Sequence, residues 1–166
     1  MANKIQKIIA NFWFDGQAEE AANFYVSVFK DASIGRITRY VKEGQEIHGK
    51  PVGSVMTVEF QIEDQEFLAL NGGPEFKFSE AISFIINCES QEEIDYYWDK
   101  LTEGGDEKAQ ICGWLKDKFG VSWQVTPIAL NEMLMDSDTE KVERVMKSFM
   151  QMKKIDLTEL QKVYES

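Results

Sequence analysis

Residues 112–125 read Cys-Gly-Trp-Leu-Lys-Asp-Lys-Phe-Gly-Val-Ser-Trp-Gln-Val, a pattern that predicts two strands joined by a turn. An apolar pair ends at Leu115, a polar stretch runs to Gly120, and apolar and polar residues then alternate from Val121 to Val125. A period of two places alternate side chains on opposite faces of a sheet. We therefore expect adjacent strands that present two tryptophans and a glutamine, where an amphipathic pocket can form.

The bulk composition is typical of a folded globular protein. The chain has 166 residues, of which 43% are hydrophobic and 12% aromatic, enough for one compact domain with a core. Its formal net charge of -11 disfavours nucleic acid and anionic membrane surfaces as partners. No apolar run approaches the roughly 20 residues of a membrane-spanning helix, and no signal peptide is expected. Cys88 and Cys112 are too few for a disulfide framework, which favours a cytoplasmic location.

Two halves of the chain show the same order of elements. In the first half we expect a strand at 5–14, a helix at 18–29 and strands at 33–41, 52–62 and 66–70. In the second half we expect a strand at 82–87, a helix at 91–101 and strands at 111–116 and 121–126. The two helices align at an offset of 73 residues, which pairs Glu19-Glu20 with Glu92-Glu93. The pattern predicts an internal duplication.

These elements predict an α+β protein built as a single domain of residues 1–166, with module one at about 5–74 and module two at about 80–127. A helical extension follows at about 128–166, with Ser137-Asp138-Thr139-Glu140 resembling a capping box and Asp156 a second N-cap. Five of the seven methionines fall between Met133 and Met152. The favoured interpretation is a helical face that packs on the sheet; the alternative is an adaptable partner-binding surface.

Several motifs together resemble one protein family. They are Asp15-Gly16-Gln17-Ala18-Glu19-Glu20-Ala21, Phe24-Tyr25, Ala69-Leu70-Asn71-Gly72-Gly73-Pro74, Ser90-Gln91-Glu92-Glu93, Trp98, Cys112-Gly113-Trp114-Leu115-Lys116-Asp117, Trp123-Gln124 and Met152-Lys153-Lys154-Ile155-Asp156-Leu157. They look like the PhnB-like family, named after a 3-demethylubiquinone-9 3-methyltransferase, of the glyoxalase/bleomycin resistance/dihydroxybiphenyl dioxygenase (vicinal oxygen chelate) superfamily. The resemblance implies two βαβββ modules that each curve a sheet around a cleft, a small-molecule ligand and a homodimer.

The family's name implies methyl transfer, which these residues do not favour. A methyltransferase needs a nucleotide-sized site, usually a Gly-rich turn between a first strand and a helix. Here Asn71-Gly72-Gly73 is followed by Pro74 and no helix is expected. We therefore do not expect methyltransferase activity.

Metal-dependent members of the superfamily place His, Glu or Gln on equivalent strands. By this resemblance the ligand positions fall at Ala10, at Ala69 or Leu70, near Ala81 and at Gln124. Only Gln124 carries a donor, so we expect no metal and no cofactor. The leading hypothesis is a metal-free small-molecule-binding protein, and whether it is an enzyme stays open. One alternative is a divalent-metal lyase, isomerase or dioxygenase of the glyoxalase type; another is a regulatory or interaction module.

The candidate ligand-binding residues combine flat apolar walls with amide and charged groups. They are Trp13, Asn71, Cys112, Trp114, Lys116, Trp123 and Gln124. Taken singly, each has a structural interpretation: the tryptophans as core, Lys116 as part of a turn and Cys112 as a buried thiol. Cys112 is not expected to be a nucleophile, because the only histidine, His48, is remote in the sequence. No catalytic residue is predicted.

Overall fold

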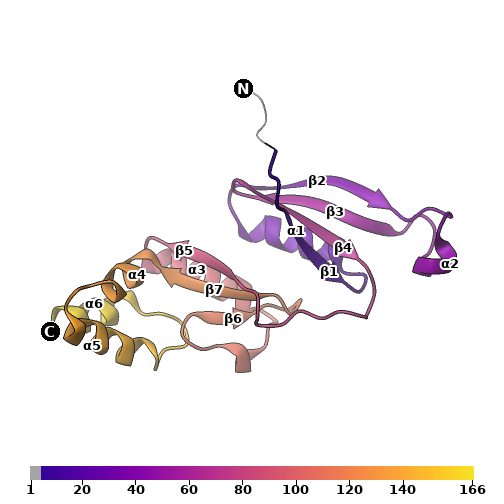
Figure 1. The fold of residues 1–166 in the computed structure, drawn as a ribbon. Helices are drawn as coiled ribbons and strands as arrows, with labels where there is room; N and C mark the ends of the chain where they lie inside the picture. The colour runs from indigo at the N-terminus through magenta and orange to yellow at the C-terminus, as the bar shows by residue number, and fades with distance from the viewer. Residues whose placement is uncertain (1–4) are drawn as a thin grey trace. The chain divides into compact units, whose positions relative to one another are not determined.

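The computed structural model describes residues 5–166, and the chain divides after Lys77 into two compact units (Figure 1). Each unit contains a sheet with a helix packed on one of its faces. The mixed α+β class predicted from the sequence is confirmed. In the part of the chain that the structure describes, no helix is long and apolar enough to cross a membrane.

The first unit is a four-stranded sheet with one long helix. Its elements are β1 (Ala10–Phe14), α1 (Ala18–Val28), β2 (Ala32–Arg39), the short helix α2 (Gln45–His48), β3 (Val55–Ile62) and β4 (Gln65–Asn71). The strand order is β1-β4-β3-β2, with β1 parallel to β4 and the other pairs antiparallel. β1 and β3 begin later than expected, whereas β2 and β4 each begin one residue earlier, and the segment between β2 and β3 contains α2.

One face of this sheet packs against α1 and forms the core of the unit. Phe12 on β1 and Phe60 on β3 contact the Tyr25 ring of α1, with ring centroids 6.1 and 5.9 Å from it. Val58 and Ala69 are fully buried on the same face. The alternation of the strands therefore directs the intervening side chains to the opposite face, which α1 does not cover.

The second unit repeats this plan in a shortened form. Its elements are β5 (Phe84–Cys88), α3 (Gln91–Thr102), a 3-10 turn (Glu107–Ala109), β6 (Trp114–Lys116) and β7 (Ser122–Pro127). The order is β5-β7-β6, and β5 is parallel to β7 just as β1 is to β4. The shared parallel pairing supports the predicted duplication. The unit has three strands because residues 107–111 form the 3-10 turn and a single bridge between Ile111 and Trp114.

Three helices complete the second unit: α4 (Ile128–Leu134), α5 (Thr139–Phe149) and α6 (Leu157–Glu165). Asp156 caps α6 through Glu159, as the sequence indicated. The cap of α5 is Asp138, which accepts from the Glu140 and Lys141 amides, and not Ser137, the first residue of the expected capping box. The buried residues of the extension form one cluster: Leu130, Met133, Val145, Ile155 and Leu160. The apolar face of α5 therefore packs mainly on α4 and α6, which corrects the expectation that it packs on the sheet.

Candidate functional site

The face of the first sheet that α1 leaves uncovered, here called the open face, carries two cross-strand rows of polar and apolar side chains. Strand register places Asn11, Leu68 and Glu59 in one row across β1, β4 and β3. The neighbouring row contains Glu66, Gln61 and Ser33 on β4, β3 and β2. Directly opposite side chains on adjacent strands lie within contact distance. The open face therefore gathers amides, carboxylates and aliphatic groups from all four strands.

A β-bulge brings Arg36 into the first of these rows. Ile34 pairs with Phe60 and Ile37 with Val58, so two residues, Gly35 and Arg36, lie opposite the single residue between them on β3. Strict alternation would send Arg36 to the α1 face, but the bulge turns it to the open face, a role that bulges often have beside functional sites.

Glycine at position 35 is required by the close approach of β3. A Cβ atom there would lie 3.0 Å from the Cβ of Glu59. That is tighter than ordinary van der Waals contact, so a larger residue would displace Glu59 or the bulge. The absent side chain lets the two strands approach while Arg36 reaches across them.

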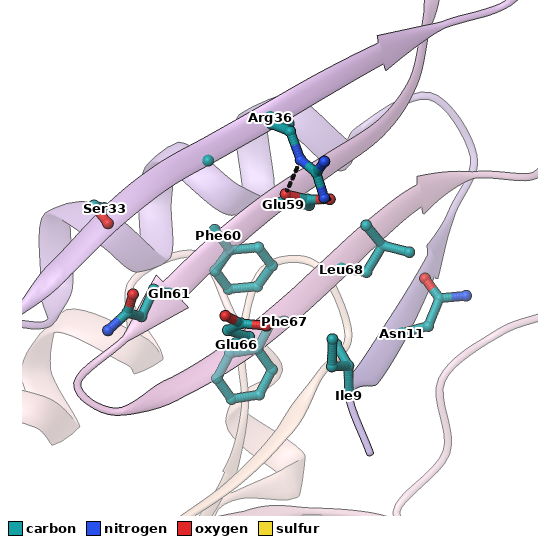
Figure 2. Close-up of a pocket in the computed structure, with 11 residues that line it drawn as sticks. Ile9, Asn11, Ser33, Arg36, Glu59, Phe60, Gln61, Glu66, Phe67 and Leu68 are labelled. Carbon is teal, nitrogen blue, oxygen red and sulfur yellow. Dashed lines mark hydrogen bonds and ion pairs between the residues drawn. The ribbon is translucent and has the colours of Figure 1, made fainter. Parts of the chain in front are cut away.

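Arg36 and Glu59 form a two-point ion pair. Arg36 Nε donates to Glu59 Oε2 at 2.9 Å and Nη2 donates to Oε1 at 2.8 Å (Figure 2). This bidentate geometry fixes both groups more firmly than a single contact does. The hydrogen bond from Arg36 is the main reason why the pKa of Glu59 lies below its usual range, and the same hydrogen bond raises the pKa of Arg36.

A cavity of about 340 Å³ lies over these rows and is called the open-face pocket here (Figure 2). Its lining residues come from β1, β2, β3, β4 and the segment just before β1. They are Ile9, Asn11, Ser33, Gly35, Arg36, Glu59, Phe60, Gln61, Glu66, Phe67 and Leu68. A cavity of this size with a few convergent polar groups is typical of small-molecule sites.

The two candidate residues of the first unit are placed differently. Trp13 lies beside the pocket on β1, where its Nε1 donates to Gly73 O at 2.8 Å and its ring contacts Phe76. Asn71 is buried at the end of β4, and its Oδ1 accepts a hydrogen bond of 2.8 Å from the Ala18 amide at the start of α1. Its Nδ2 donates to Val55 O. Asn71 therefore acts as a structural cap for α1.

Three candidate residues of the second unit share one sheet face. Trp114 pairs with Gln124 and Lys116 with Ser122, so these side chains lie on the same side of β6 and β7. Gln124 Nε2 donates to Ser83 Oγ at 2.9 Å, and Lys116 forms an ion pair with Glu80. The segment before β5 thus supplies partners for both polar groups.

Trp123 lies on the opposite face and is a core residue. Only 3% of it is exposed, and its Nε1 donates to Asp117 Oδ2 at 2.8 Å. Asp117 is also buried, and its Oδ1 accepts from the Phe119 and Val121 amides. This carboxylate organises the turn between β6 and β7. The geometry therefore supports a core role for Trp123 and a structural role for the turn, rather than ligand binding.

The two cysteines are free thiols in different surroundings. Burial raises the pKa of the Cys88 thiol to about 12, which keeps it protonated and unreactive near neutral pH. Cys112 is only partly buried, has a left-handed backbone conformation and lies 4.0 Å from Met150 between the two sulfur atoms. Its amide donates to Met152 O, so it ties the second sheet to the helical extension.

The superfamily's metal positions in the first unit carry no donor side chain. Ala10 and Ala69 have no donor atoms, and strand register places both on the α1 face rather than the open face. Leu70 lies on the open face and is also without a donor. Among residues 5–166, no group of three or more His, Cys, Asp or Glu side chains is arranged to hold a metal ion.

None of the seven candidate ligand-binding residues lines the open-face pocket. The sequence pattern places lining residues such as Arg36, Glu59 and Leu68 in strands but does not mark them as a site, because the pocket depends on register and on the bulge. The one available signal was the pair of amphipathic strands at 52–62 and 66–70, whose polar positions form the open face.

Comparison with known proteins agrees with this architecture. Residues 6–126 match the family described as 3-demethylubiquinone-9 3-methyltransferase, so the match ends before α4. The solved structure of the PhnB protein from Bacillus cereus is 36% identical, with a TM-score of 0.63, and the alignment covers 74% of this chain and 99% of that one. A Pseudomonas aeruginosa protein of known structure, 18% identical, shares the fold with a TM-score of 0.55, over 74% of this chain and 98% of its own.

No curated protein matches the chain. Because the family match covers most of its residues, the chain belongs to the PhnB-like family described as 3-demethylubiquinone-9 3-methyltransferase.

Proposed function

We propose that this protein binds a small aromatic or apolar molecule in the open-face pocket, as a metal-free member of the glyoxalase/bleomycin-resistance superfamily. The observation that carries the proposal is a cavity of about 340 Å³ on the helix-free face of the first sheet. Leu68 and Ile9 offer apolar contacts there, and Asn11 and Gln61 offer amides. The alanines at two of the superfamily's metal positions support binding without a metal.

A thermal-shift screen of aromatic fragments tests this proposal. We expect several fragments to raise the Tm of the wild-type protein. Asn11 is exposed and lines the pocket, so Asn11→Trp should fill it and abolish those shifts without unfolding the protein. Asn23→Trp, at an exposed position on α1, is the matched control and should retain them. Equal shifts in both variants would place binding elsewhere.

We also propose a homodimer in the cytoplasm. The dimer is supported by β1 and β5, which are edge strands of their sheets and offer backbone groups for pairing with another chain. The two free thiols support a reducing compartment. Native mass spectrometry of freshly purified protein should show a dimer without stoichiometric metal. A dimer with one divalent ion per chain would favour a metalloenzyme of the glyoxalase type instead.

A further inference from the structure

The charged groups of the open-face pocket are unequal in number. Its lining residues include one cation, Arg36, and two carboxylates, Glu59 and Glu66. All other lining residues are neutral. At neutral pH the pocket therefore has an excess of one negative charge, within a chain whose net charge is -11.

The single cation already has an internal partner. Both oxygens of Glu59 accept hydrogen bonds from Arg36, at 2.8 and 2.9 Å. A ligand carboxylate that bound the Nε and Nη2 groups of Arg36 would have to displace Glu59. Glu59 would then be left without its counter-ion on the same sheet face as Glu66, and like charges repel.

Glu66 is the carboxylate that remains available. It lies across from Gln61 on the open face, and no hydrogen bond or ion pair to its carboxylate is found among residues 5–166. Its charge also contributes to the raised pKa of Arg36, behind the larger effect of Glu59, and it is one of the residues that line the pocket. A cation entering the pocket meets this carboxylate without breaking any existing contact.

We propose that the open-face pocket selects cationic ligands over anionic ones, and takes a ring-sized apolar body that carries a protonated nitrogen such as an amine or amidine. This inference rests on the proposed function. The aliphatic side chains of Leu68 and Ile9 would contact the body of the ligand, and Glu66 would bind the charged end.

Three probes of the same shape test the charge preference on the full-length protein: benzamidine, benzamide and benzoate. Their dissociation constants are measured by amide chemical-shift titration at low ionic strength. We expect benzamidine to bind about fivefold or more tightly than benzoate, with benzamide between them, as one net charge at contact distance near a surface predicts. If benzoate binds as tightly as benzamidine, the charge preference is wrong, but the proposal that the pocket binds small molecules still stands. Failure of all three to shift pocket amides would count against the proposed function itself.

Two matched variants separate the pocket from the charge of the whole protein. Glu66→Gln and Glu143→Gln each remove one negative charge from an exposed residue, the first inside the pocket and the second on α5. We expect Glu66→Gln to weaken benzamidine severalfold and leave benzamide unchanged, and Glu143→Gln to change neither. Equal weakening by both variants would mean that net charge alone sets the preference, and would overturn the inference.

Discussion

Arg36 reaches Glu59 because a bulge places two residues of β2 opposite one residue of β3, and the resulting ion pair lies in the open-face pocket. Without the extra residue, strict alternation would point Arg36 to the α1 face of the sheet, away from Glu59. The bulge, the glycine that precedes Arg36 and the facing carboxylate thus act as one arrangement. It positions two of the charged side chains that line the open-face pocket.

Substitution of Arg36 should change how Glu59 titrates. Arg36 lowers the pKa of Glu59 mainly through its hydrogen bonds, so their stabilising effect is present above the ordinary pKa of glutamate and is lost as the pH falls through the lowered value. In Arg36→Met, Glu59 should therefore titrate at a higher pH than in the wild type. Carboxyl-detected NMR titration of both proteins measures this difference. Identical titration curves would mean that the pair does not persist in solution.

Gly72 should be intolerant of any side chain because Trp13 covers it. A Cβ atom at position 72 would lie 2.2 Å from the indole ring. Gly72→Ala should therefore cost about 1–3 kcal/mol in the free energy of unfolding, as overpacked sites do. The cost should be smaller when Trp13 is also replaced by leucine. Urea unfolding of the wild type, the two single variants and the double variant measures this difference. If Gly72→Ala costs the same with and without the Trp13→Leu change, the destabilisation comes from the backbone conformation and not from the contact with the indole.

Asp117 should be important for the stability of the second unit. Its carboxylate accepts three hydrogen bonds, from Trp123 Nε1 and from the Phe119 and Val121 amides. Asp117→Asn replaces an acceptor by a donor at a buried position, and should lower the free energy of unfolding by about 1–3 kcal/mol. Asp64→Asn, at an exposed turn, should have little effect. Comparable losses in the two variants would contradict the role given to Asp117.

The two thiols should differ in reactivity. Cys88 is 1% exposed and its pKa is raised to about 12 by burial, so it stays protonated at pH 8.5. Iodoacetamide should label Cys112 of the native protein first, and Cys112→Ser should be almost unlabelled until it is denatured. Mass spectrometry of timed samples follows the reaction. Rapid labelling of Cys88 in the native Cys112→Ser variant would show that the β5 region opens readily.

Gln91 should tie the helical extension to α3. Its Oε1 accepts from the Leu157 amide at 2.8 Å, and its Nε2 donates to Ile155 O at 3.1 Å. Gln91→Ala leaves these partly buried backbone groups without partners, and should lower the free energy of unfolding by about 1–3 kcal/mol. Lys100→Ala, on the exposed surface of the same helix, is the control. An unchanged unfolding curve for Gln91→Ala would mean that the extension is held by its apolar contacts alone.

The regular part of the fold was predictable from local pattern. The helix at 18–29 and the helix at 91–101 follow from apolar spacing and acidic first turns, and the structure places both within one residue of those bounds. The capping of α6 by Asp156 was likewise visible in the sequence. Such features depend on residues close together in the chain, so the sequence is sufficient to locate them.

The site was less predictable because it depends on contacts between distant residues. The role of Asn71 is set by its hydrogen bond to Ala18, 53 residues away, and no local pattern indicates that bond. The orientation of Arg36 is set by a bulge that strict alternation does not predict. Trp123 and Gln124 are consecutive on β7 and therefore point to opposite faces of the second sheet. The alternation alone does not say which face α3 covers and buries.

The central claim, that a small molecule binds on the open face of the first sheet, is tested most directly by mapping the binding of the fragment that raises the Tm most. Amide chemical shifts of the assigned full-length protein are recorded with and without that fragment. We expect the perturbed amides to cluster around Asn11, Glu59 and Leu68, and the perturbations to disappear in Asn11→Trp. Perturbations confined to residues 78–166, or unchanged in Asn11→Trp, would contradict the claim.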